Sequence, residues 1–360
     1  MLLGSPMGRA VILTICILLA VSAPARAVER PPQFVEIAFD NCTELERWQE
    51  LSAFAADMNK DGNRLHFTFF VSGINFIADA NRNLYQAPGH GRGASNIGFG
   101  GSADDVRQRV DYINALYQSG HEIGSHAVGH FSGRGWSAGD WSRELQSFHD
   151  ILANVGPNNG LGDDVKFAFP MAELKGFRAP YLDNSPGLYA TLKDDGYRYD
   201  TSSDSEQAAW PDKVNSLWRF NLARIELHNT NKHMLSMDYN FFIAQSHGMV
   251  IPSRQDFFKQ QMLDTYLDYF KANYTGDRAP INIGHHFFDY QGGAYREALL
   301  DFAQMVCGLP EVRCATYSTL ADFLDKQDPA TLEAYRHGDF PHASDPLLVA
   351  DNWVLRGRLN

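Results

Sequence analysis

Two histidines four residues apart are the clearest sign of chemistry in this sequence. His126 and His130 belong to the segment Ser125-His126-Ala127-Val128-Gly129-His130, which follows a short apolar run. On one turn of a helix, residues i and i+4 face the same side, and two neutral imidazoles can then bind one divalent ion at about 2.0–2.1 Å. The 360-residue chain contains 13 histidines, so such pairs also arise by chance. The spacing therefore predicts a metal site only if other residues support it.

Further polar side chains follow predicted strands, at the point where each strand ends. In a parallel α/β barrel, catalytic groups collect at these carboxyl ends. A carboxylate at the end of a core strand costs free energy unless a partner group compensates its charge. Taken singly, Asp40 could be a helix N-cap, Arg178 a surface ion pair and Asp238 a loop-capping carboxylate. The whole set is Asp40-Asn41, His126 with His130, Arg178, Asp238 and His285-His286.

The elements that must position these residues alternate between strand and helix. Repeated βα units imply a parallel sheet, either open or closed into a barrel. Thr43 and Glu46 resemble a capping box at the start of the first helix. The hydrophobic periodicity predicts strands at 34–39, 66–71, 121–124, 176–178, near 200, 234–237 and 280–284, and helices at 43–58, 106–117, 141–152, 186–193, 255–273, 295–306 and 317–324.

One long segment, 80–102, breaks this alternation. It is rich in glycine and asparagine and has no hydrophobic periodicity. Loops of this length inside a compact domain are often functional. The alternative is a mobile surface insertion.

The first residues have the pattern of a secretory signal peptide. Arg9 is basic, residues 10–20 are apolar, and Ala25-Arg26-Ala27 is a small-x-small cleavage site. We therefore expect an exported protein, periplasmic or secreted after cleavage near Ala27, and keep an uncleaved anchor as the alternative. No later segment approaches 18 uninterrupted apolar residues, so we expect no membrane span in the mature chain. Residues 28–326 then form the catalytic domain, and 327–360 form a tail that packs on it.

Charge and cysteine content restrict the partners and the compartment. Acidic residues outnumber basic ones 43 to 31 and the basic residues form no block, which argues against nucleic acid and favours a neutral or cationic substrate. Cys307 and Cys314 bracket a short loop, and an oxidising compartment favours a disulfide between them. The alternative is two reduced thiols that merely pack. Cys42 is then left as a small buried residue.

Four short motifs, in this order, resemble those of the polysaccharide deacetylase family with the NodB-type homology domain. They are FDN (39–41), SHAVGH (125–130), RAPY (178–181) and a late strand ending in histidine. The similarity spans about residues 34–325, nearly the whole mature chain. The family includes chitin and peptidoglycan deacetylases, and the resemblance implies an α/β fold built as a distorted (β/α) TIM-like barrel.

The resemblance implies catalytic roles for several residues. Asp40 matches the base that activates the attacking water, and Arg178 matches the arginine that orients this base and favours its ionised form. His286 best matches the acid that protonates the leaving amine. The neighbouring His285 leaves a one-residue ambiguity, because successive strand residues face opposite sides. Asp238 is a looser match to an acidic residue that tunes the proton affinity of the acid histidine, and we expect it among the substrate-binding residues.

The resemblance also implies a bound metal, with zinc the expected ion. His126 and His130 match two ligands, and Asn41 occupies the position where the family usually has a second aspartate. An amide oxygen can still coordinate, but it offsets none of the ion's charge, so metal affinity should fall. Tyr181 matches an aromatic wall that contacts substrate.

These expectations lead to one function and two alternatives. We expect an exported, metal-dependent hydrolase that removes N-acetyl groups from a chitin-like amino-sugar glycan. The first alternative is an amidase or esterase that uses the same metal site on another substrate, and the second is a carbohydrate-binding pseudoenzyme. Aromatic residues near the motif loops could stack on sugar rings or simply pack; they are Phe131, Trp136, Trp141 and Tyr181.

Overall fold

The computed structural model describes residues 28–62 and 64–344. The predicted signal peptide and its cleavage site lie outside these residues. So does the part of the predicted tail (327–360) that follows residue 344. Within the described part of the chain, no helix combines the length and the apolar character needed to cross a bilayer.

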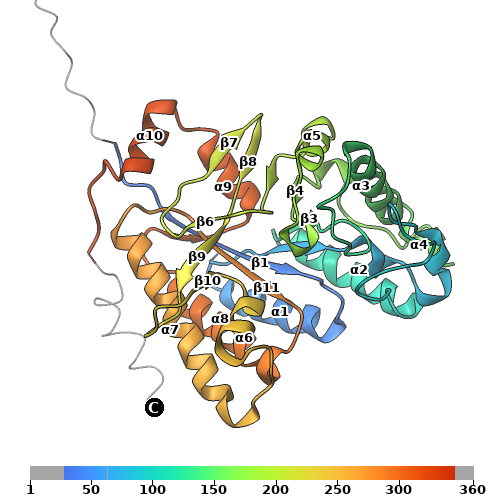
Figure 1. The fold of residues 1–360 in the computed structure, drawn as a ribbon, viewed down its shortest axis with the longest axis horizontal. Helices are drawn as coiled ribbons and strands as arrows, with labels where there is room; N and C mark the ends of the chain where they lie inside the picture. The colour runs from blue at the N-terminus through green and yellow to red at the C-terminus, as the bar shows by residue number, and fades with distance from the viewer. Residues whose placement is uncertain (1–27, 63, 345–360) are drawn as a thin grey trace, which may run out of the picture.

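A curled sheet of nine strands forms the centre of the molecule (Figure 1). Its order is β11-β1-β2-β3-β4-β5-β8-β7, with β12 also pairing with β1. All neighbours are parallel except the edge pair β7 and β8. No pairing within 28–62 and 64–344 joins β7 back to β11, so the barrel is distorted and incompletely closed, and the predicted fold class is confirmed. The strands are β1 (Gln33–Asp40), β2 (Thr68–Val71), β3 (Glu122–Ser125), β4 (Gly176–Phe177), β5 (Tyr199–Asp200), β7 (Asp212–Val214), β8 (Leu217–Arg219), β11 (Ile281–His286) and β12 (Val312–Cys314).

A second, three-stranded sheet contains the strand predicted at 234–237. It has the order β10-β9-β6, and β10 runs antiparallel to β9. The predicted strand stops at Leu235 and pairs with β9 rather than with a barrel strand, and Asp238 begins a helix, but Met237 still forms a parallel bridge to Gly284 of β11. The main-chain N–H of Gly284 donates to the carbonyl of Ser236 at 3.0 Å, so the segment before Asp238 still lies against β11. The elements are β6 (Asp204–Glu206), β9 (Leu222–Glu226), β10 (His233–Leu235) and α6 (Asp238–Ser246).

Helices surround the central strands (Figure 1), and the predicted ones form with small changes at their ends. The first begins at Leu45 because Thr43 does not cap it: the Thr43 hydroxyl donates to Asn75 Oδ1 at 3.2 Å instead, and the N-cap residue, Glu44, makes no side-chain cap. Besides α6, the α-helices are α1 (Leu45–Met58), α2 (Ala103–Gln118), α3 (Ala138–Ala153), α4 (Val155–Asn158), α5 (Pro186–Asp194), α7 (Gln255–Thr275), α8 (Ala294–Val306), α9 (Tyr317–Leu324) and α10 (Pro329–His337). Short 3₁₀ turns are η1 (Gly73–Phe76), η2 (Asp79–Leu84), η3 (Met171–Glu173), η4 (Pro180–Leu182), η5 (Pro252–Arg254) and η6 (Tyr290–Gly293).

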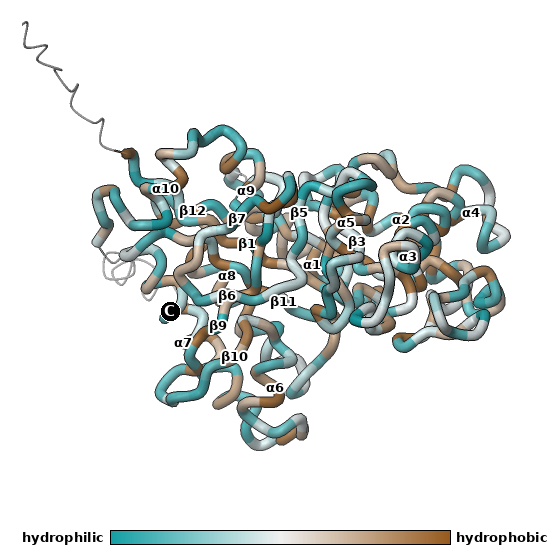
Figure 2. Tube along the Cα trace, turned by 45° about the horizontal axis from the view of Figure 1, so that its top comes forward, coloured by the Kyte–Doolittle hydropathy of each residue, from teal (hydrophilic) through white to brown (hydrophobic). Residues whose placement is uncertain are grey.

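Strand β1 divides the core and aims the first site residue. Ile37 and Phe39 pack in the cluster shared with α1, whereas Ala38 packs with interior aromatic residues such as Tyr317. Because side chains alternate along a strand, Asp40 faces the same interior side as Ala38. Hydrophobic residues lie along the central strands (Figure 2).

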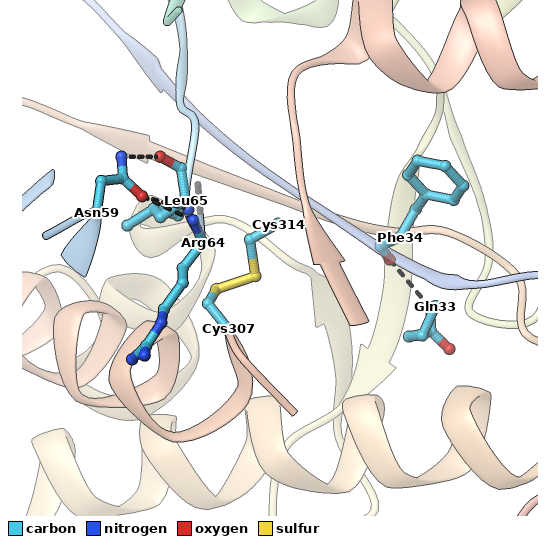
Figure 3. Close-up of a disulfide and its surroundings, with 7 residues drawn as sticks. All are labelled: Gln33, Phe34, Asn59, Arg64, Leu65, Cys307 and Cys314. Carbon is cyan, nitrogen blue, oxygen red and sulfur yellow. Dashed lines mark hydrogen bonds between the residues drawn. A yellow bond between two sulfur atoms is a disulfide. The ribbon is translucent and has the colours of Figure 1, made fainter. Parts of the chain in front are cut away.

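A disulfide links the end of α8 to the neighbouring strand β12. Cys307, after α8, is bonded to Cys314 at the end of β12 (Figure 3), as the sequence predicts. Cys42 is a free, buried thiol. In the described part of the predicted tail, the Tyr335 ring of α10 stacks on Trp210 with centroids 4.9 Å apart.

Candidate active site

A pocket of about 480 Å³ opens at the carboxyl ends of the strands and gathers the predicted site residues. Six of the eight line it directly, although they come from four separate segments of the chain. The other two, Arg178 and Asp238, lie behind the wall and contact residues that line it. The lining residues are Asp40, Asn41, His126, His130, Ala179, Tyr181, Leu182, Leu235, Met237, Tyr239, Asn240, His286, Phe288 and Tyr290.

Asp40 and Arg178 form a buried ion pair. The guanidinium Nη1 donates to Asp40 Oδ1 at 2.9 Å, and both side chains are at most 2% exposed. Arg178 also donates to the hydroxyls of Thr201, at 2.7 Å, and Tyr317, at 3.1 Å, and its plane covers the Phe70 ring at 4.5 Å. Burial works against the charge on Arg178, but the nearby Asp40 carboxylate outweighs it and raises the arginine pKa. The pair therefore fixes one oxygen of Asp40 and keeps the cation charged.

The two predicted metal-binding histidines meet, but on a loop rather than a helix. Ala127 and His130 have left-handed backbones, with φ of 56° and 57°. The carbonyls of Ala127 and Val128 accept from the N–H groups of η1, so they are not used for helical hydrogen bonds. The helical interpretation of the spacing is wrong, yet the rings of His126 and His130 lie with centroids 5.1 Å apart. Burial lowers the pKa of both rings, to about 3 for His130, so both are neutral as ligands must be.

The donor atoms around this histidine pair fit a divalent ion. His126 Nδ1 lies 2.7 Å from the carbonyl oxygen of Arg178. When Nδ1 carries the ring proton and donates it to this oxygen, Nε2 keeps a lone pair that is directed toward the pocket. Among residues 28–62 and 64–344, no group hydrogen-bonds to the buried His130 Nδ1, and the Nε2 of this ring lies 3.3 Å from the Asn41 amide nitrogen. Two donors that share a tetrahedral ion at about 2.0–2.1 Å are about 3.3–3.4 Å apart.

Asn41 decides how strongly this site can hold a cation. Turning its amide by 180° would place Oδ1 toward His130 and Nδ2 toward the Ser72 hydroxyl, which lies 3.5 Å from the present Oδ1; amide atoms are interchangeable in this way. The donor set is then two imidazoles and one neutral oxygen. Within the described residues, no group of three His, Cys, Asp or Glu side chains is placed to hold a metal, because the third position is an amide.

His286, and not His285, faces the pocket. Its Nδ1 lies 2.7 Å from Asp238 Oδ1, and its main-chain N–H donates to Asp238 Oδ2 at 2.8 Å. His285 points to the other side of β11, where its Nε2 lies 3.0 Å from the Tyr266 hydroxyl. Burial opposes a charge on His286, but the Asp238 carboxylate outweighs it and raises the pKa of the ring. Asp238 therefore stabilises the protonated form of the histidine that lines the site.

The aromatic wall differs in part from the sequence prediction. Tyr181 stands at the mouth, 58% exposed, with its ring 4.6 Å from that of His130. Trp141 and Phe131 are buried, and Trp136 packs edge-on against Trp141 with centroids 4.8 Å apart. For these three, the packing alternative is the one that the structure shows.

Three further aromatic residues line the mouth and were missed in the sequence. Phe288 is 69% exposed and stacks on Tyr290, with centroids 5.3 Å apart, and Tyr239 lies 6.0 Å from Tyr290. Phe288 and Tyr290 follow His286 within four residues, so their position after a strand that ends in a predicted site residue was a usable signal. Tyr239 gave none, because only the packing of α6 against β11 brings it to the pocket.

Comparison with solved structures supports the fold, whereas the two sequence comparisons find no match. No protein-family model matches the chain, and no curated protein matches it significantly. Among solved structures, it is similar to a protein from Mycobacterium smegmatis assigned as a polysaccharide deacetylase. That match has 16% identity and a TM-score of 0.51, and covers 86% of this chain and 95% of the other.

Two other similar structures have lower TM-scores. One is the Xyl-CE4 domain of a multidomain xylanase from the hindgut metagenome of Trinervitermes trinervoides, with 12% identity, coverage of 82% and 93%, and a TM-score of 0.41. The other is a peptidoglycan deacetylase from Bacillus subtilis, with 11% identity, coverage of 89% and 98%, and a TM-score of 0.42. The strand order, the motif positions and the Mycobacterium smegmatis match together show that this chain has the NodB-type fold of the polysaccharide deacetylases.

Proposed function

We propose that this protein is an exported, metal-dependent deacetylase that removes N-acetyl groups from a chitin-like amino-sugar glycan. One observation carries the proposal. A single pocket has a carboxylate base held by Arg178 on one side, a histidine acid held by Asp238 on another, and two neutral histidines with free nitrogen lone pairs beside them. A metal-assisted hydrolysis of an amide uses a base, an acid and metal ligands of these kinds.

The proposed reaction adds water to the acetamide carbonyl and then breaks the C–N bond. Asp40 takes a proton from the water, while Arg178 holds its Oδ1 so that the other carboxylate oxygen faces the nucleophile. His286, kept protonated by Asp238, donates a proton to the departing amine, so that acetate and a free amino sugar result.

The metal, most simply zinc, would be held by His126, His130 and the amide oxygen of Asn41. When bound, it supplies a Lewis acid that lowers the pKa of water and polarises the carbonyl. The neutral third ligand leaves the full double charge of the ion in the pocket. We therefore expect weaker metal retention than a second aspartate would give.

The mouth of the pocket supports a glycan as the substrate. Tyr181, Tyr239 and Phe288 are large side chains, each at least 47% exposed, that surround the opening. Exposed rings of this kind are suited to the apolar faces of sugars. Export is proposed from the N-terminal signal pattern, and the disulfide between Cys307 and Cys314 is consistent with an oxidising compartment.

Asn41 favours one competing function, a carbohydrate-binding pseudoenzyme without turnover. Metal analysis of purified protein, together with acetate release from chitooligosaccharides, distinguishes the two. Zinc in the protein and acetate release that is lost in Asp40→Asn support the deacetylase. Glycan binding with neither zinc retention nor acetate release, at saturating zinc, would instead establish the pseudoenzyme.

A further inference from the structure

The loop that carries His130 is strained and needs support from outside itself. Ala127 and His130 both adopt left-handed backbones, with φ of 56° and 57°. For residues other than glycine this conformation is unfavourable, because Cβ comes too close to the neighbouring carbonyl oxygen. Such a backbone persists only where surrounding contacts hold it. The contacts made by the two residues between them, Val128 and Gly129, therefore decide where the His130 ring lies.

A buried carboxylate holds the main chain of this loop. Glu144, on α3, is 1% exposed, and its Oε1 accepts from the N–H groups of Val128, at 3.0 Å, and Gly129, at 3.4 Å. Two successive N–H groups directed at one anion form a nest, a favourable arrangement for negative charge. The Glu144 carboxylate takes no part in the proposed reaction and does not line the pocket.

Tyr85 completes this support from the glycine-rich segment 80–102. Its hydroxyl lies 2.9 Å from both oxygens of Glu144 and accepts from the N–H of Gly129 at 3.2 Å. The Tyr85 ring also packs against the loop, since a Cβ added to Gly129 would come within 2.6 Å of it. The ring and hydroxyl together leave the loop little room to move.

Asn96, from the same segment, holds the other side of the loop. Its main-chain N–H donates to the carbonyl of Gly129 at 3.0 Å, and its Nδ2 donates to the carbonyl of His130 at 3.0 Å. The same Nδ2 lies 3.4 Å from the hydroxyl of Tyr181 at the pocket mouth. The segment predicted either to be functional or to be a mobile insertion is thus bonded directly to a candidate ligand.

We propose that Glu144, Tyr85 and Asn96 are positioning residues that hold His130 in its metal-binding orientation. The inference rests on the proposed function, because it assigns these residues to the same metal site. Partners that orient a ligand in this way typically change metal affinity by about 10- to 100-fold when removed. Segment 80–102 therefore supports the His130 loop from behind and does not line the pocket itself.

The test uses Tyr85→Phe, which removes one hydroxyl, with Tyr117→Phe as a matched control. The Tyr117 hydroxyl also donates to a carboxylate, that of Glu173, but on an exposed surface away from the pocket. The probe is Co²⁺, titrated into the full chain and followed by its visible absorption. We expect Tyr85→Phe to weaken Co²⁺ binding about 10-fold or more and to change the absorption band, while Tyr117→Phe binds as the wild type does.

Two outcomes overturn the inference or separate it from the proposed function. Co²⁺ binding by a folded Tyr85→Phe variant with wild-type affinity and spectrum overturns it. If the wild type itself binds no Co²⁺, the metal-dependent function fails, and the His130 imidazole signal in nuclear magnetic resonance of the metal-free protein becomes the readout. A shift of that signal in Tyr85→Phe but not in Tyr117→Phe then supports positioning, and no shift refutes it.

A second variant pair tests Glu144 in the same way. Glu144→Gln keeps an oxygen for the N–H groups of Val128 and Gly129, whereas Glu144→Leu keeps none. We expect Glu144→Gln to retain Co²⁺ affinity more closely than Glu144→Leu. Wild-type affinity in both folded variants would contradict a positioning role for the carboxylate.

Discussion

Replacing Arg178 with methionine should destabilise the protein strongly. Arg178 is fully buried, and the change removes its hydrogen bonds to Asp40, Thr201 and Tyr317 as well as its contact with the Phe70 ring. Asp40, only 2% exposed, would keep a buried charge with no cation beside it. Removing one partner of a buried ion pair costs about 3–5 kcal/mol, because the remaining charge is uncompensated. We expect a loss of this size in urea unfolding at pH 7, and no detectable turnover.

A double-mutant cycle isolates the charge effect from the lost packing. Asp40→Asn combined with Arg178→Met buries neither charge, and neutral replacements of buried pairs are often tolerated. We expect the double variant to be more stable than Arg178→Met alone, with a coupling energy of about 2–3 kcal/mol. Turnover should stay absent, because the base is missing. Strictly additive losses would refute the view that Arg178 stabilises the fold chiefly by compensating the Asp40 charge.

An exposed arginine provides the control for this cycle. Arg336 lies 3.4 Å from Glu333 and 3.3 Å from Asp212, and both carboxylates are well exposed. Surface pairs of this kind contribute about 0–1 kcal/mol. Arg336→Met should therefore change the unfolding free energy by less than about 1 kcal/mol. A loss comparable to that of Arg178→Met would show that the assay does not report burial.

Three further changes test the pH behaviour and the metal site. Asp238→Asn removes the charge that raises the pKa of His286, so the alkaline limb of the kcat/KM profile should move to lower pH; an unmoved limb would show that His286 is not the acid. Glu36 is fully buried, neither carboxylate oxygen has a hydrogen-bond partner in the described part of the chain, and burial raises its pKa well above the usual value. The native state keeps a proton on Glu36 that the unfolded state releases, so this group favours folding at low pH and loses its contribution as pH rises. Glu36→Gln should therefore be more stable than the wild type in urea unfolding at pH 8, with a smaller difference at pH 5. An equal difference in stability at both pH values would argue against this. Asn41→Asp places a carboxylate on a left-handed backbone that aspartate tolerates, and should tighten zinc about 10-fold or more in a chelator competition; unchanged affinity would remove Asn41 from the ligand set.

Much of the site could be predicted from the sequence because its residues lie at strand ends. The sequence signals for Asp40, Arg178 and His286 are short motifs directly after apolar runs, and parallel strands bring such ends together. The disulfide was predicted because Cys307 and Cys314 bracket a short loop and an oxidising compartment favours their pairing. These features depend on local spacing, which the chain itself encodes.

Other features depend on neighbours that are distant in the chain. The spacing of His126 and His130 suggests a helix, but hydrogen bonds from η1 hold that segment as a loop. Alternation along a strand shows that His285 and His286 face opposite sides, but only the position of the pocket decides which one is functional. The support that Glu144 gives to the loop is likewise invisible in the sequence, since the carboxylate lies 16 residues from Val128 and reaches it through packing.

The sequence by itself determined which chemical groups are present, the order of strands and helices that delivers them, and the type of fold. The tertiary structure alone decided the direction in which each group points, including the placement of Asp238 on α6 and the aromatic mouth formed with Tyr239. The physical reason is that residue type and periodicity are properties of a short segment, whereas orientation results from hydrogen bonds and packing between segments far apart in the chain.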